Sequence, residues 1–214
     1  MTKLTVLFAA LALTLTAAAC GGKKEDVPAA SAKTTGGGDK AGGGDKAAPA
    51  VKAPTLVINE ADWVEKDLST VSPMVGITMK VPKDATLEKN GNGGVDIKVA
   101  DFYMLTVSAL AVSNVAEGIG WRKSLTIGHS GYQDGKVITE EPTGIITSAQ
   151  MKTEENGTAY QPEVHFAHFV EKDGAVWAIT DERSLDAFST PGSAWTEALA
   201  KQVYGLVKAS AKAK

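Results

Sequence analysis

The sequence lacks the features that define several protein classes. It has a single cysteine in 214 residues, which excludes a disulfide-rich scaffold. Basic residues are not in excess: 22 Lys and Arg against 25 Asp and Glu give a net charge of -3, which argues against a nucleic-acid binder. Only one apolar run approaches the length of a membrane span, so a polytopic membrane protein is excluded. With 43% hydrophobic residues, the chain is also too apolar to be disordered throughout.

The N-terminus has the organisation of an export signal. Lys3 precedes an apolar run over residues 4–19, which is short for a membrane span and typical of a signal peptide. The run ends in Ala17-Ala18-Ala19-Cys20, which resembles the lipobox of bacterial lipoproteins. In that family the cysteine is acylated, commonly with palmitate, and becomes the new N-terminus. Ala17 departs from the family pattern, where Leu, Val or Ile usually stands three residues before the cysteine.

Two alternatives to lipidation remain open. The same alanines satisfy the small-x-small rule of ordinary signal peptidase, which would leave Cys20 as a free thiol on a secreted protein, and the run could remain uncleaved. A lone cysteine has no intramolecular partner in an oxidising envelope, whereas its position suits a lipid attachment point. We therefore predict lipidation of Cys20 and stable membrane anchoring by two or three acyl chains. Gly21, in place of Asp, implies by the same resemblance export to the outer membrane of the bacterial cell envelope.

A flexible tether is expected to follow the signal peptide. Residues 20–54 contain no aromatic residue and include the tandem hexapeptides Gly36–Ala41 and Gly42–Ala47. Such a segment cannot bury enough apolar surface to offset the entropy of ordering. We predict a signal peptide over 1–19, the lipidated cysteine and tether over 20–54, and one globular domain over 55–214.

The globular part is predicted to be α+β, with a mostly antiparallel sheet of about six to eight strands. A helix over 115–127 is expected behind the N-cap Asn114, and a closing C-terminal helix is expected from the spacing of Trp195, Leu199, Val203 and Leu206. Asp173-Gly174 predicts a hairpin. Strands are predicted over residues 55–59, 75–81, 95–99, 102–110, 136–140, 145–151, 160–171 and 175–180.

The order of these elements resembles that of PsbP-like domains. An early strand closed by a proline lies at Ile77–Pro82, a late hairpin at 164–180 and a closing helix at 195–207, so the resemblance covers about residues 74–210. It implies a sheet with helices packed on it and a binding or assembly role. The family has no shared catalytic residues that could be assigned here.

Three patterns in the sequence have features of chemical sites. His165 and His168 lie three apart on a predicted strand, so they are expected on opposite faces and do not predict a shared metal site. Ser130 lacks the second glycine of a nucleophile elbow, because Tyr132 stands in its place. Neighbouring carboxylates such as Asp181-Glu182 are interpreted as solvated strand edges. No catalytic residue, metal or cofactor is predicted.

Trp121 and Tyr132 flank the weakest secondary structure and are the aromatic residues we select for an exposed recognition surface. The function predicted from the sequence is that of a membrane-tethered, non-catalytic envelope lipoprotein that binds another envelope protein as an interaction or assembly module. The alternative is an envelope binder of a small ligand such as a glycan or lipid, and an enzyme is the third hypothesis. No nucleic-acid partner is expected.

Overall fold

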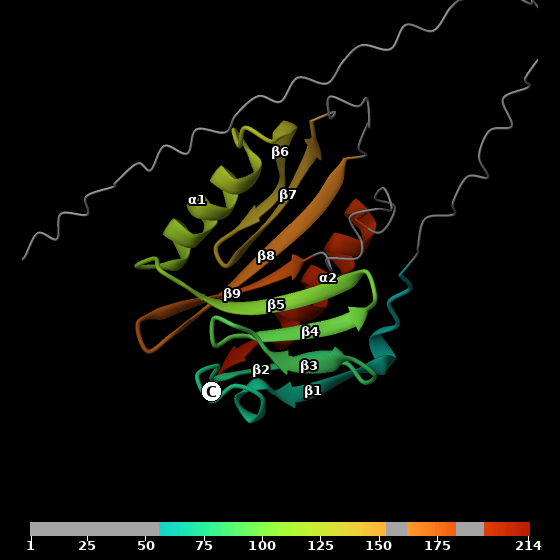
Figure 1. The fold of residues 1–214 in the computed structure, drawn as a ribbon, viewed down its shortest axis with the longest axis vertical. Coiled ribbons are helices and arrows are strands. Elements are labelled where there is room, and N and C mark those ends of the chain that lie inside the picture. Colours follow the sequence, from blue (N-terminus) through green and yellow to red (C-terminus); the bar gives the residue numbers. More distant parts are fainter. Residues whose placement is uncertain (1–55, 153–161, 183–194) are drawn as a thin grey trace, which may run out of the picture. The chain divides into compact units, whose positions relative to one another are not determined.

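Two antiparallel sheets and two helices form the part of the chain that a computed structural model describes, residues 56–152, 162–182 and 195–214 (Figure 1). The larger sheet has the strand order β3-β4-β5-β9-β8-β7-β6, and the smaller one the order β1-β2-β10. The predicted α+β class with mostly antiparallel strands is therefore confirmed. Within the described ranges, no helix combines the length and the hydropathy needed to cross a membrane.

The bounds of the helices and strands follow the order of the chain. They are β1 (Trp63–Asp67), β2 (Ile77–Pro82), β3 (Thr86–Lys89), β4 (Val95–Ala100), β5 (Tyr103–Leu110), α1 (Val115–Thr126), β6 (Tyr132–Glu141), β7 (Gly144–Met151), β8 (Glu163–Lys172), β9 (Ala175–Glu182), α2 (Glu197–Ser210) and β10 (Lys212–Ala213), with short 3-10 turns at Glu60–Asp62 and Leu68–Thr70.

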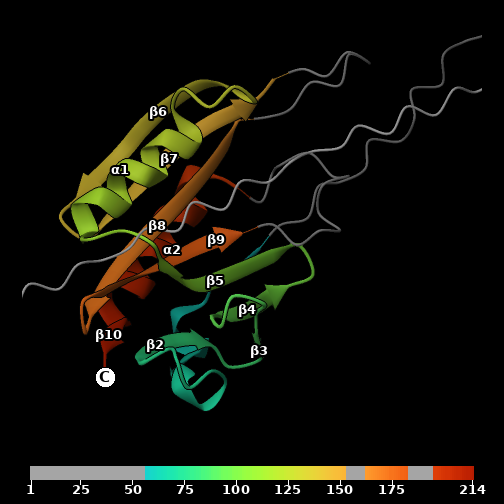
Figure 2. The ribbon, with the colours of Figure 1, turned by 60° about the vertical axis from the view of Figure 1, so that its left-hand side comes forward.

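The large sheet lies between two apolar layers, one on each face. Helix α1 packs Ile119 against Ile145 and Phe169 on one face, and α2 and the small sheet cover the other (Figure 2). The second layer is the main core. It contains residues of β2, β4, β5, β8, β9 and α2, among them Val203 and Val207 from the helix.

Local sequence explains most of these elements. In β5, Tyr103, Leu105 and Val107 are buried in alternation, as the period-two pattern requires. The Asn114 side chain caps α1 by accepting a hydrogen bond from the Glu117 backbone N–H at 2.9 Å. Asp173 and Gly174 have positive φ angles of 51° and 75°. Positive φ at both central residues is typical of the type I′ turn that joins the strands of two-residue hairpins. The helix, the hairpin and the central strands were thus predicted correctly.

Several predicted boundaries were wrong or incomplete. Residues 56–59 are not a strand, because the Asn59 side chain instead caps a 3-10 turn by accepting a hydrogen bond from the Ala61 backbone N–H. Trp195 lies before α2, whose N-cap is Thr196. The seven strands of the large sheet agree with the six to eight expected, whereas β1, β3 and β10 were not predicted, since they are short and weakly patterned. Cys20, the tether and the start of the predicted strand at Tyr160 lie outside the described residues.

Helix α2 is fastened to the large sheet through Tyr204. Its hydroxyl donates to Glu141 Oε2 at 2.9 Å, and Lys208 forms an ion pair with the same carboxylate, which lowers the pKa of Glu141. The Tyr204 ring packs on His168, and burial lowers the pKa of that imidazole. This cluster connects α2 to the end of β6 and to β8 through polar side chains.

The close packing of Tyr204 on Gly144 gives a stability prediction. A Cβ at position 144 would overlap the Tyr204 hydroxyl and would lie 2.8 Å from the Ala167 carbonyl oxygen, so Gly144→Ala should lower the free energy of unfolding by about 1–3 kcal/mol. In the matched control, Gly205→Ala on α2 has open space and should raise it by about 0.5–1 kcal/mol. Urea unfolding measures both values. Equal stability of Gly144→Ala and the wild type would contradict this account of how α2 is seated.

Candidate functional site

Strands β8 and β9 separate at one end of the large sheet. Their ladder ends with the pair Ala167–Thr180, and the same register would next place Phe166 opposite Asp181. Beyond that point, residues 163–166 continue to pair with β7, while Asp181 and Glu182 pair with β5. We call this gap between two neighbouring strands the strand opening.

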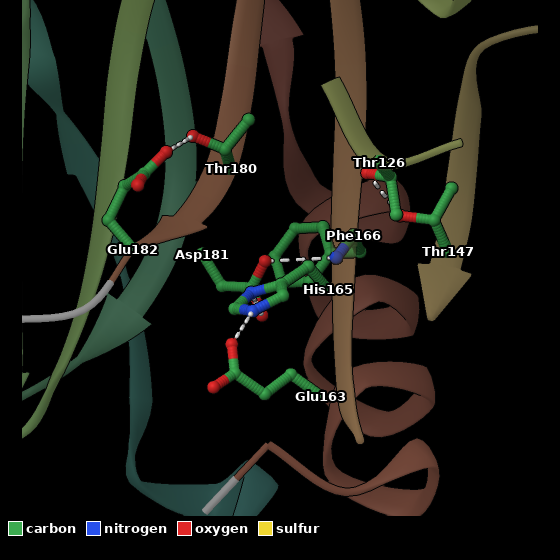
Figure 3. Close-up of polar contacts among 8 residues, drawn as sticks. All are labelled: Thr126, Thr147, Glu163, His165, Phe166, Thr180, Asp181 and Glu182. Carbon is green, nitrogen blue, oxygen red and sulfur yellow. Dashed lines mark hydrogen bonds and ion pairs between the residues drawn. The ribbon is translucent and has the colours of Figure 1, made fainter. Parts of the chain in front are cut away.

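Two groups from outside the ladder occupy the strand opening. Asp181 Oδ1 accepts a hydrogen bond from the Phe166 backbone N–H at 2.9 Å (Figure 3). The Trp195 carbonyl accepts one from the Val164 N–H, also at 2.9 Å. A buried backbone N–H needs such an acceptor when its strand neighbour moves away. Asp181 is only 2% exposed, so its carboxylate is part of the protein interior.

His165 lies between two carboxylates at this opening. Its Nε2 is 3.1 Å from Glu163 Oε2, and its Nδ1 is 3.3 Å from Asp181 Oδ2 (Figure 3). A protonated imidazole can donate from both nitrogens, whereas a neutral one donates from only one. The ring also packs on Trp195, with centroids 5.4 Å apart, and Trp195 in turn contacts Tyr103. Burial, followed by the charge of Asp181, raises the pKa of the Tyr103 hydroxyl.

A groove of about 550 Å³ lies beside the strand opening, and we call it the sheet-end groove. One wall comes from α1 and the loop after it, with Arg122, Leu125, Thr126 and His129. Thr126 also reaches Thr147 on β7, with 3.3 Å between their hydroxyl oxygens, which holds the end of α1 to the sheet (Figure 3).

The other wall of the sheet-end groove is made by strands. Tyr132 begins β6, and its ring packs on His129 with centroids 5.5 Å apart. The remaining lining residues lie at the ends of β7, β8 and β9, and they are Ala149, Met151, Glu163, His165, Asp181 and Glu182. The groove therefore joins an apolar surface to a group of charged side chains from two strands, β8 and β9.

The two aromatic residues selected from the sequence lie in different places. Trp121 is 41% exposed on α1 and is not among the residues that line the sheet-end groove. Tyr132 is half-buried and lines it. The structure does not bring the two together in this groove, and their role in recognition stays a prediction. The predicted lipidation site, Cys20, lies outside the described residues.

The histidine pair has the expected strand geometry. His165 lines the groove, whereas the His168 ring packs on Tyr204 of α2, as expected for residues three apart on a strand. Within the described ranges, no three His, Cys, Asp or Glu side chains are grouped so that they could hold a metal ion.

The interpretation of Asp181 as part of a solvated strand edge was wrong. This residue lies where β8 diverges from β9, and its side chain is buried there. Glu163 was missed altogether, since a single acidic residue at the start of a strand gives no signal in the sequence.

Comparisons with known proteins identify no relative of this chain. No protein-family model, curated protein or solved structure matches the chain. The resemblance to PsbP-like domains and the lipobox resemblance therefore remain predictions from the sequence.

The role of Asp181 at the strand opening can be measured by substitution. Asp181→Ala leaves the buried Phe166 N–H without its acceptor and should lower the free energy of unfolding by about 1–3 kcal/mol. Asp181→Asn keeps an oxygen acceptor for this N–H, so its free energy of unfolding should fall by less. Glu171→Ala, an exposed change on β8, is the control and should stay within about 0.5 kcal/mol of the wild type. If the Ala and Asn variants lost the same stability in urea unfolding, the hydrogen-bond account would be wrong.

Proposed function

We propose that this domain binds a small polar ligand in the sheet-end groove, and that Cys20 holds it at the membrane of a bacterial envelope. The observation that supports this proposal most is the buried Asp181 carboxylate, which lines the same cavity as Arg122. Ligand pockets typically measure 300–1,000 Å³ and combine apolar walls with a few converging polar groups. The groove has the volume and the mixture of side chains that this class requires.

The groove is built on regular elements, which favours specific recognition. Its charged residues lie on α1, β8 and β9, and Asp181 is fixed by its hydrogen bond to Phe166. A rigid carboxylate loses little conformational entropy when it binds a ligand. This is why we favour the small-ligand alternative over the protein-assembly module that the sequence first suggested.

The membrane anchor rests on the sequence alone. Acylation at Cys20 and the glycine-rich tether would place the domain near the envelope membrane, and by the lipoprotein resemblance near the outer one. A tether of this length reaches roughly 30–35 Å as a random coil. The domain would then sample ligands in the space beside the membrane.

The assembly module remains the second candidate, because several large apolar side chains are exposed near α1. Trp121 and Ile127 lie on or directly after this helix, and Val137 lies on the edge strand β6. Exposed apolar residues of this kind support a protein contact if they form one continuous patch. An aromatic residue such as Trp121 would be its expected energetic centre.

Ligand-observed NMR with a mixed library tests the proposed function. The library would contain amino acids, sugars, nucleotides, organic acids and polyamines. We expect at least one compound to bind the wild type and to lose binding in Leu125→Trp, because the larger side chain fills the groove. The control Val137→Trp places the same indole on exposed β6 outside the lining and should keep binding. Failure of every compound to bind would contradict the ligand function and leave the assembly module as the better proposal.

Mass spectrometry of the N-terminal peptide tests the anchor. We expect acylated Cys20 at the N-terminus of the wild type recovered from the membrane fraction. Cys20→Ser removes the thiol that accepts the lipid and should release the processed protein into the soluble envelope fraction. An unmodified wild-type Cys20 would contradict the anchor and would favour ordinary secretion or an uncleaved segment.

A further inference from the structure

We propose that the ligand of the sheet-end groove is a small zwitterion, an amino acid or a short peptide, which places its ammonium group against the β8–β9 wall and its carboxylate against Arg122. This inference rests on the proposed function and adds the chemical class of the ligand. It comes from opposite charges on the two walls of one cavity.

The strand wall is acidic. Glu163, Asp181 and Glu182 supply three carboxylates to the lining, and His165 lies between two of them, 3.1 Å from Glu163 Oε2 and 3.3 Å from Asp181 Oδ2. Asp181 is the most buried of the three, and among the described residues its Oδ2 has no hydrogen-bond partner, although it lies 3.3 Å from His165 Nδ1. A buried carboxylate with an unused acceptor favours a cationic donor. An ammonium group supplies three such donors.

The helix wall carries the complementary charge. Arg122 forms no ion pair within the described ranges, and its buried Nε has no hydrogen-bond partner there. Its neighbour Lys123 points elsewhere and pairs with Glu140 at 2.6 Å. A guanidinium group is suited to bind a carboxylate through two parallel hydrogen bonds. Arg122 thus provides the anion-binding end of the groove.

The rest of the lining suits the side chain of such a ligand. Leu125, Ala149 and Met151 contribute apolar side chains to the groove, and Tyr132 adds an aromatic ring. A volume of about 550 Å³ leaves room for more than one amino-acid residue. A glycan would use neutral hydrogen-bonding groups and aromatic faces, and it would leave both charged ends of this groove unpaired.

Isothermal titration calorimetry with the full-length protein in detergent can test the class of ligand. The probes are the twenty L-amino acids and a set of dipeptides, each compared with an analogue that keeps only the amine or only the carboxylate. At least one zwitterionic probe should bind roughly tenfold or more tightly than both of its analogues, since each analogue loses one charge-assisted contact.

Substitutions separate the two ends of the groove. Arg122→Gln should weaken binding of the zwitterionic probe by roughly tenfold or more, while binding of the amine-only analogue is unaffected. Glu182→Gln should weaken binding of the zwitterion and binding of the amine-only analogue alike. This substitution leaves in place the structural hydrogen bond of Asp181. Lys123→Gln is the matched control on the same helix and should leave binding unchanged.

The possible outcomes distinguish this inference from the proposed function. If the groove binds only sugars, organic acids, polyamines or a metal ion, and Leu125→Trp blocks that binding, the groove is a ligand site but the zwitterion is the wrong class. If Arg122→Gln and Lys123→Gln weaken a zwitterionic probe equally, the assignment of Arg122 is overturned. If no probe of any class binds, both the inference and the proposed function fail.

Discussion

The replacement of a strand neighbour by the Asp181 side chain determines how one end of the large sheet is built. In a continuous ladder, the Phe166 N–H would bond to the β9 backbone, but here it donates to a carboxylate. The backbone groups of a buried strand cannot be left without partners, so β8 can diverge from β9 only where side chains or other segments supply acceptors. Asp181 and the Trp195 carbonyl supply them, and the sheet-end groove is a consequence of that divergence.

In the proposed function, the same carboxylate contributes both to stability and to ligand recognition. One oxygen of Asp181 accepts the hydrogen bond from the Phe166 N–H, and the other lies 3.3 Å from Nδ1 of His165, which lines the groove. A buried charge of this kind is costly unless it is compensated, and incompletely compensated polar groups are found often at binding sites. Arg122 on the opposite wall is a second group with unused hydrogen-bonding capacity. The proposed ligand satisfies both groups at once, which is the physical reason to expect a molecule with two opposite charges.

The sequence predicts the elements well but predicts the site poorly. Alternation along β5, the Asn114 cap and the Asp173-Gly174 turn are local signals, and each of them was interpreted correctly. The burial of Asp181 is not local, because it depends on where β8 leaves β9 and on Trp195 from a distant segment. In the sequence Asp181 resembles any polar residue near the end of a strand. Tyr132 was selected for its position near weak secondary structure, and it does line the groove, whereas Arg122 and Glu163 gave no recognisable pattern.

Amide hydrogen exchange at Phe166, followed by NMR, is the most direct test of this account. The amide should be protected in the wild type to a degree similar to that of Phe169, whose N–H bonds to the Thr143 carbonyl at 2.8 Å. Protection should fall in Asp181→Ala at Phe166 and not at Phe169. An unprotected Phe166 amide in the wild type would show that Asp181 does not replace the missing strand neighbour, and the structural basis proposed for the groove would then be wrong.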